Sequence, residues 1–464
     1  MLRYLLTSLL LCCCLFAGAQ IRLPAVIADN MVLQQNDSVM LWGWAGPGEK
    51  IRVTTSWNGR VDSVVTTRDA KWQLKVKTPA AGGPYDITLR GNTTVKLQNV
   101  LIGEVWVCSG QSNMEWSANH GLKQMAAEMP ICADANIRFF HVPKTTATYP
   151  QDDAKASWTA CDSNNLKRFS AVAYFFGKKL RKDLNVPIGL INTSWGGTPA
   201  EVWTPAQEVT SQPALVEAAG KLTPSNGWPN QPGYTYNAMI APFIQYSIAG
   251  AIWYQGESNA GTASTYDQLM RTMIGSWRKA WGREFPFYFV QIAPYNYGKE
   301  TIKGALLREA QTVTSAYGHT GMIVITDLVN DTANIHPQNK QDVGIRLANW
   351  AMGDHYSKTG IAYKSPMYDK MEQRNGKIVV YFKNAENGLK VNGGKPTQFY
   401  IAGADKQFWP ADVKIEGNTA IVSAKAVKQP EAVRFSFTNT GIGNVFSKEG
   451  LPVGPFRTDN WQEK

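Results

Sequence analysis

Four polar segments in the central part of the chain, three of which contain glycine, carry the residue types that acyl transfer requires. They are residues 109–114, 193–198, 255–259 and 327–336. A serine hydroxyl attacks an acyl carbonyl once a neighbouring imidazole removes its proton, and N–H groups then stabilise the oxyanion that forms. Ser112 lies in the first segment and His336 ends the last. We therefore predict a serine hydrolase site with Ser112 as nucleophile and His336 as general base.

The other residues of these segments fit the supporting roles of such a site. Donors to the oxyanion are expected from the backbone N–H groups of Ser112, Gly196 and Gly197 and from the side-chain amide of Gln255 or Asn259. An aspartate that accepts a hydrogen bond from the imidazole would fix its tautomer. Asp331 is the predicted partner of His336, and Asp327 is the alternative. Contacts with the substrate are expected from Gln111, Trp195, Trp253 and Glu257.

Each of these features has a simpler explanation when it is taken alone. A serine after glycine commonly forms a turn or caps a helix, and a lone histidine is commonly structural. Glu257 can tie two loops together by hydrogen bonds. Paired with Asp327 or Asp331, it would instead suit a glycosidase if the two acids lay ~5–10 Å apart across a cleft. The interpretation as a serine hydrolase therefore depends on all four segments meeting in one place.

Alternating strands and helices are predicted to bring the four segments together. Buried strands are expected at residues 100–109, 188–193, 248–254, 287–292 and 322–326, and helices at residues 169–184, 265–281, 301–317 and 340–355. Such alternation indicates an α/β domain with a parallel sheet. Ligand sites of these sheets lie beyond the carboxyl ends of the strands, and each polar segment follows a predicted strand.

Two regions of short strand-like runs flank this domain. Residues 20–99 and 363–464 contain β-branched and aromatic runs separated by turn sequences, which predicts a β-sandwich module on each side of a catalytic domain at residues 100–362. Residues 1–19 combine Arg3, an apolar run and a small-residue ending, the pattern of a cleaved secretory signal peptide. We therefore expect an exported protein, periplasmic or extracellular, with no membrane span.

Composition and charge argue against several other classes of protein. With 44% hydrophobic and 18% charged residues, the chain is globular rather than disordered or of low complexity. Its net charge of +11 comes from scattered lysines and arginines, so no nucleic-acid partner is expected. No spacing of cysteine and histidine is typical of a metal site, and no metal, cofactor or obligate protein partner is expected. In an oxidising compartment Cys132 and Cys161 are the better disulfide pair, while Cys108 is expected to be buried.

Several longer motifs follow one another along the chain. They are Val105-Trp106-Val107-Cys108-Ser109-Gly110-Gln111-Ser112-Asn113-Met114-Glu115-Trp116, Ile191-Asn192-Thr193-Ser194-Trp195-Gly196-Gly197, Tyr236-Asn237-Ala238-Met239-Ile240-Ala241-Pro242, Trp253-Tyr254-Gln255-Gly256-Glu257-Ser258-Asn259 and Ile335-His336-Pro337. Together they resemble the signature of the sialate O-acetylesterase family, a branch of the SGNH (GDSL-like) hydrolases. The resemblance implies a flavodoxin-like α/β/α core flanked by β-modules, with Ser112 as nucleophile and His336 as base. It also implies removal of O-acetyl groups from sugars without a metal or cofactor.

The sequence departs from the SGNH pattern at one position. These hydrolases usually carry an aspartate three residues before the histidine, where this chain has Ala333. The third member of the triad is therefore open between Asp331, Asp327, another partner such as Asn334, and none. The sugar is open as well, since acetylated sialic acid, xylan and other hemicelluloses all fit. A non-catalytic glycan-binding protein is the alternative from another class, because 16 tryptophans would also suit sugar binding.

Overall fold

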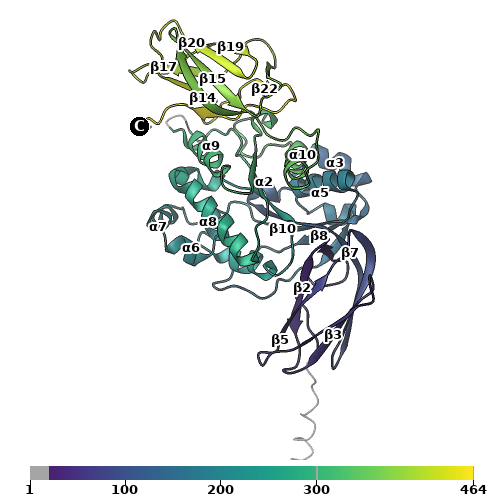
Figure 1. The fold of residues 1–464 in the computed structure, drawn as a ribbon. Helices are drawn as coiled ribbons and strands as arrows, with labels where there is room; N and C mark the ends of the chain where they lie inside the picture. The colour runs from purple at the N-terminus through teal and green to yellow at the C-terminus, as the bar shows by residue number, and fades with distance from the viewer. Residues whose placement is uncertain (1–19, 299–300, 463–464) are drawn as a thin grey trace, which may run out of the picture.

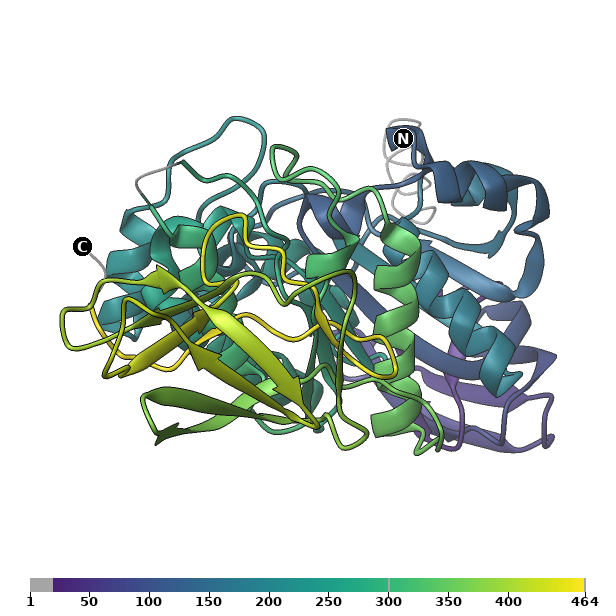
Figure 2. The ribbon, with the colours of Figure 1, turned by 90° about the horizontal axis from the view of Figure 1, so that it is seen from above.

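The computed structural model describes residues 20–298 and 301–462 (Figure 1). The predicted signal peptide lies outside these residues. No helix in the described part of the chain is long and apolar enough to cross a membrane. An N-terminal group of strands, an α/β centre and a C-terminal group of strands follow one another along the long axis of Figure 1. Figure 2, which looks down on the C-terminal strands, shows them lying across the central part.

A parallel sheet runs through the centre of the molecule. Its strands are, in spatial order, β13 (Thr320–Ile323), β12 (Phe287–Val290), β11 (Gly250–Tyr254), β7 (Thr94–Gly110), β10 (Ile188–Ser194) and β8 (Asp134–His141), with β9 (Trp158–Cys161) antiparallel at the edge. The sequence predicted a strand at five of these places, with somewhat different ends. It missed β8, which begins with the polar residues Asp134 and Asn136, and β9, which is only four residues long.

Helices cover both faces of this sheet. Successive side chains of a strand point to opposite faces, so each strand contributes to two hydrophobic cores. Trp106 and Cys108 of β7 share one hydrophobic core with side chains of α5 (Ala171–Leu184) and α10 (Lys340–Trp350). Val105 and Val107 of the same strand share another with α8 (Ala263–Trp281) and α9 (Lys303–Thr314). The centre is therefore a three-layer α/β/α arrangement, and all four helices lie close to their predicted positions.

The strand that leads to Ser112 begins in the N-terminal group of strands. β7 first pairs antiparallel with β6 (Gly82–Arg90), then parallel with β1 (Val32–Gln34), and finally with β10 and β11. The same group contains β2 (Ser38–Trp44), β3 (Lys50–Thr55), β4 (Val61–Val65) and β5 (Lys71–Lys77). Asn99, at the predicted domain boundary, has a φ of 55° but does not end the strand. The chain therefore enters the central sheet without a linker.

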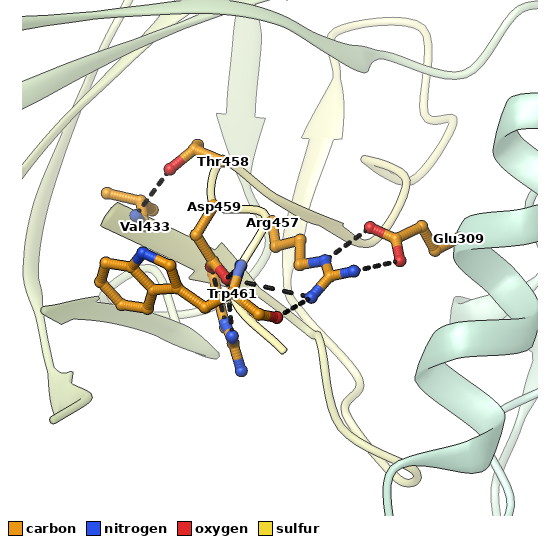
Figure 3. Close-up of polar contacts among 7 residues, drawn as sticks. Glu309, Val433, Arg457, Thr458, Asp459 and Trp461 are labelled. Carbon is orange, nitrogen blue, oxygen red and sulfur yellow. Dashed lines mark hydrogen bonds and ion pairs between the residues drawn. The ribbon is translucent and has the colours of Figure 1, made fainter. Parts of the chain in front are cut away.

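The C-terminal group of strands has its own hydrophobic core and antiparallel sheets. Its strands are β14 (Met367–Arg374), β15 (Lys377–Lys383), β16 (Leu389–Val391), β17 (Phe399–Ala402), β18 (Trp409–Pro410), β19 (Asp412–Glu416), β20 (Thr419–Ser423), β21 (Ala432–Phe435), β22 (Val445–Ser447) and β23 (Phe456–Arg457). Arg457 donates to both carboxylate oxygens of Glu309 on α9, at 2.7 and 2.8 Å (Figure 3). Such a bidentate, charge-assisted pair fixes orientation as well as contact, so it fastens this module to the centre.

The cysteines are not bonded to one another in the described part of the chain. Cys108, Cys132 and Cys161 are all buried free thiols. The predicted disulfide is thus not formed, although the two residues are neighbours: the Cys161 thiol donates to the carbonyl oxygen of Cys132 at 3.1 Å. Burial raises the pKa of both thiols, which keeps them protonated and weakly nucleophilic.

Candidate active site

Ser112 lies in a sharp turn directly after β7. Gly110, the last residue of the strand, has a φ of 136°, and a Cβ atom there would come within 2.2 Å of the carbonyl oxygen of Tyr254. Only glycine tolerates both conditions. The N–H group of Gln111 donates to that same oxygen at 3.0 Å, and the short helix α2 (Ser112–Glu115) then begins. The turn therefore places the serine at the carboxyl end of the central strand.

The structure brings His336 onto this serine. The Nε2 atom of His336 lies 2.9 Å from the Oγ atom of Ser112, within the range at which a general base can remove a proton. The loop before α10 is held so that this contact forms. The N–H group of His336 donates to Asn334 Oδ1 at 2.9 Å, and the carbonyl of Ile335 accepts from Asn113 Nδ2 at 3.1 Å. Two predicted residues far apart in sequence thus meet.

The imidazole of His336 is held in its neutral form. Burial lowers its pKa to about 4, and the positive charge of Lys340 acts in the same direction. One ring face stacks on Trp116, with ring centroids 4.4 Å apart and an interplanar angle of 20°. A neutral imidazole can accept the serine proton, so the ring is in the form that a general base requires.

Neither predicted aspartate is bonded to this ring. Asp331 accepts the N–H group of Ala333 at 2.8 Å, and Asp327 makes a bidentate ion pair with Arg346 of α10 at 2.7 and 2.5 Å. Among the described residues, the imidazole has one hydrogen bond, the contact with Ser112. The structure therefore gives no hydrogen bond in support of Asp331 or Asp327 as the third member of a triad.

Backbone donors lie near Ser112, but one of them is already used. A Cβ atom on Gly196 would lie 3.3 Å from the Cβ atom of Ser112, so the two residues are in contact. The Gly196 N–H group donates to the carboxylate of Glu115 at 2.5 Å. In the described part of the chain, the N–H groups of Ser112 and Gly197 have no hydrogen-bond partner. These two N–H groups are therefore not used by the fold.

The two predicted side-chain donors belong to the scaffold instead. The amide of Gln255 donates to the carbonyl of Thr198 at 3.2 Å and to Asn259 Oδ1 at 2.8 Å. The amide of Asn259 donates to Glu201 at 2.8 Å. Both residues are fully buried, and a buried amide must satisfy its hydrogen bonds locally. The structure therefore does not bring either amide to Ser112.

Of the predicted substrate contacts, Trp253 lies in the hydrophobic core, whereas Trp195 and Gln111 lie in the segments around Ser112. Trp253 is fully buried, and its ring centroid lies 6.1 Å from those of both Trp203 and Trp277. Its ring therefore belongs to the hydrophobic core and not to the site. Trp195 is half-buried, and its indole N–H donates to the carbonyl of Gly227 at 3.2 Å. Gln111 Oε1 accepts from the backbone N–H group of Gly256 at 3.3 Å, which ties the turn that carries Ser112 to the loop after β11.

A buried polar network that the sequence analysis missed lies beside the Ser112–His336 pair. Asn113 Nδ2 donates to Glu257 Oε1 at 2.6 Å, and Asn113 Oδ1 accepts from Lys340 Nζ at 2.5 Å. Lys340 is fully buried; burial lowers its pKa to about 7, which the charge of Glu257 opposes. Burial likewise raises the pKa of Glu257. A lysine that opens a helix ordinarily faces solvent, so no pattern in the sequence signalled this role.

An exposed indole also borders the site. The ring of Trp228 packs on Gly197, where a Cβ atom would approach it to 2.3 Å, and the side chain remains 38% exposed. Gly197 adjoins Gly196, the residue in contact with Ser112. The absence of a side chain at Gly197 is what allows the indole to lie there.

The three-layer fold and the Ser112–His336 pair at the strand ends are those of an α/β esterase. A sequence profile of the family described as "Carbohydrate esterase, sialic acid-specific acetylesterase" matches residues 102–352. This chain belongs to that family, which confirms the resemblance seen in its motifs. A glycosidase would need two carboxylates that face a substrate cleft. Glu257 is instead buried against Asn113, and Asp327 is paired with Arg346, so the geometry does not support that alternative.

Relatives with known names agree with this family. The sialate O-acetylesterase of Pongo abelii is 30% identical over 395 residues, which cover 77% of this chain and 75% of the relative. The sialate O-acetylesterase of Homo sapiens is 29% identical with the same coverage. The crystal structure of a carbohydrate acetylesterase from Xanthomonas citri superposes with a TM-score of 0.87 at 37% identity, covering 95% of this chain and all of the other.

Proposed function

We propose that the protein is a carbohydrate O-acetylesterase in which Ser112 is the nucleophile and His336 the general base. The observation that carries this proposal is the 2.9 Å contact between Ser112 Oγ and His336 Nε2. His336 takes the serine proton as Oγ attacks the acetyl carbonyl, and returns it to the sugar hydroxyl that leaves. Water, deprotonated by His336, then attacks the acetyl-enzyme, and His336 passes that proton to Ser112 Oγ as acetate leaves. The free N–H groups of Ser112 and Gly197 would bind the oxyanion in both steps.

The sheet supports an SGNH-type core for this enzyme. Taken in chain order, β7, β10, β11, β12 and β13 lie side by side in the order second, first, third, fourth, fifth. That is the strand order of flavodoxin-like sheets, and β8 and β9 extend the sheet beyond β10. Sites of such sheets lie where the order reverses, which here is the carboxyl end of β7 that carries Ser112.

The substrate class is tested by acetate release from a panel of acetylated glycans. The panel should contain O-acetylated sialic acid, acetylxylan and another acetylated hemicellulose, with the Ser112→Ala variant as the control. We expect the parent enzyme to release acetate from at least one of them and the variant from none. No release from any glycan, despite hydrolysis of simple aryl acetates, would contradict the assignment to carbohydrates.

The activity should persist in mildly acidic solution. His336 must be neutral to accept a proton, and its pKa is lowered to about 4. Activity is therefore lost only as the pH falls through about 4, and not through the usual imidazole range near 6.5. The measurement is kcat/KM for an aryl acetate between pH 3.5 and 8, over a range in which the protein remains folded. An acidic limb centred near 6.5 would show that the base is a solvated histidine.

The acyl site should accept little more than an acetyl group. Gly196 contacts Ser112, and Trp195 beside it is half-buried and anchored through its indole N–H group. We expect kcat/KM to fall by about tenfold or more from acetyl to butyryl esters, the scale at which a closed pocket discriminates by size. A series of 4-nitrophenyl esters measures this directly. Equal or faster hydrolysis of the octanoyl ester would indicate an open, lipase-like pocket.

A further inference from the structure

The structure leaves open what orients the imidazole of His336. A triad aspartate does so through a hydrogen bond to Nδ1, but no described carboxylate bonds to this ring. Among the described residues, the aromatic ring that stacks on this imidazole is the indole of Trp116, with ring centroids 4.4 Å apart and an interplanar angle of 20°. We infer that Trp116 is the positioning residue for His336 and takes, by stacking, the orienting role of a triad aspartate. This inference rests on the proposed Ser–His mechanism.

The backbone of Trp116 is fixed to the nucleophile. Its N–H group donates to the carbonyl oxygen of Ser112 at 2.9 Å, which closes the short helix α2. Its own carbonyl accepts the N–H group of Ala171, the first residue of α5, at 2.8 Å. The backbone that carries the indole is therefore fixed relative to Ser112. A ring stacked on it is held relative to the serine hydroxyl.

The indole ring is in turn held by its neighbours. The buried ammonium group of Lys340 lies 5.4 Å from the ring centroid, a cation–π distance, and is anchored on Asn113. The ring of His120 also stacks with the indole, at 4.9 Å and 14°. His120 is itself fixed, because its Nδ1 atom accepts the N–H group of Ser117 at 3.1 Å. Trp116 is thus a supported platform and not a loose side chain.

Stacking orients a ring differently from an ion pair. A flat apolar face fixes the plane of the imidazole and excludes water from it, which favours the neutral form. It supplies no negative charge for the imidazolium that forms during the reaction. The titratable groups near His336 are Lys340 from α10 and His120 from the 3₁₀-helix at Ala118–His120, and a positive charge on either one disfavours the charged ring. Orientation and dehydration are therefore the contributions to test.

Three substitutions at Trp116 separate these contributions. Trp116→Ala removes the platform and admits water, so kcat should fall roughly ten- to a hundredfold, the scale of a misplaced catalytic group, and the acidic limb of kcat/KM should move up towards 6.5. Trp116→Leu keeps an apolar cover without a flat ring, so kcat should fall similarly while the limb stays low. Trp116→Phe keeps a flat ring and should retain most of the activity.

The competing assignment is tested in the same series by Asp331→Asn. We expect this variant to stay near the parent in both kcat and pH profile, because Asp331 bonds to Ala333 and not to His336. A large loss in Asp331→Asn, or parent-like kcat in both the Ala and Leu variants of Trp116, would overturn the inference. Thermal melts identify variants that fail to fold, and Trp116→Phe against Trp116→Leu remains decisive if the alanine variant is lost.

A separate measurement distinguishes failure of the mechanism from failure of this inference. Phenylmethylsulfonyl fluoride should modify the parent enzyme at Ser112, as located by mass spectrometry, at a rate that follows the neutral form of His336. Absence of that adduct together with full activity in Ser112→Ala would reject the Ser–His mechanism itself. An adduct in the parent that forms equally fast in Trp116→Ala and Trp116→Leu would reject only the role of Trp116.

Discussion

Ser112→Ala should abolish ester hydrolysis while leaving the protein folded. The Oγ atom of Ser112 has one hydrogen bond among the described residues, the contact with His336, so its removal leaves only a ring nitrogen of the half-buried His336 without that partner. Loss of a serine nucleophile lowers kcat by about 10⁴- to 10⁶-fold, with the remainder coming from binding and the oxyanion hole. The measurement is turnover of an aryl acetate, with thermal melting to confirm the fold.

A matched control separates the nucleophile from serine loss in general. Ser63 lies on β4 of the N-terminal strands, is exposed and is remote from Ser112 in the fold. Ser63→Ala should have parent-like activity and melting temperature. Ser112→Ala activity within about tenfold of the parent would contradict nucleophilic catalysis by this residue, because such a small change is typical of lost binding contacts.

The meeting of Ser112 and His336 was predictable from sequence for a topological reason. Ser112 and His336 each follow a predicted strand, and the carboxyl ends of parallel strands meet at one edge of a sheet. The sequence could predict that the two segments meet, but not the 2.9 Å contact between the two side chains. The supporting residues were less accessible, because the same segments also contain the hydrogen bonds that hold the loops together.

Gln255, Asn259 and Trp253 illustrate this limit. All three belong to the segment at the end of β11, but their side chains are buried in the scaffold. β11 is buried on both faces, so its residues show no alternation between polar and apolar types that would reveal which side chains face the site. The direction of a side chain in such a segment is set by tertiary packing, which spacing in the sequence does not encode.

The prediction of Asp331 as the partner of His336 has no hydrogen bond in its support, for a related reason. Asp331 was chosen because it lies near His336 in the sequence, but a carboxylate in a turn commonly binds the backbone of its own loop, as Asp331 does with Ala333. Conversely, Lys340 and Asn113 carry ordinary polar side chains whose burial only the packing of α10 against the nucleophile turn produces.

This buried network leads to the prediction with the largest expected effect on stability. Lys340 and Glu257 are both buried and both bond to the amide of Asn113, and Glu257 Oε2 has no hydrogen-bond partner among the described residues. Removing one member of a buried charge pair leaves the other uncompensated, which typically costs about 3 kcal/mol or more of unfolding free energy. We therefore expect Glu257→Leu and Lys340→Met each to destabilise the protein by about that amount.

The double variant Glu257→Leu/Lys340→Met should be less destabilised than the sum of the two single variants. It removes both charges together, so the desolvation cost of the unpaired partner disappears, although Asn113 still loses two hydrogen-bond partners. Denaturant unfolding of the four proteins gives the coupling free energy directly. Strictly additive effects would show that the two charges do not compensate each other across Asn113.

The pH dependence identifies Lys340 as the source of the effect. Its pKa of about 7 in the folded protein is below the usual lysine value of 10.5, so between these values the unfolded chain binds more protons and stability rises with pH. That rise should be absent in Lys340→Met. In Glu257→Gln, which keeps an acceptor for Asn113 but removes the negative charge, the pKa of Lys340 should fall further, and the rise in stability should begin below pH 7.

The raised pKa of Glu257 changes stability in the opposite direction, since stability falls as the pH rises from 4.5 through the folded-state pKa of this group. A stability curve unchanged by Lys340→Met between pH 7 and 10 would therefore mean that the buried lysine does not titrate in this range.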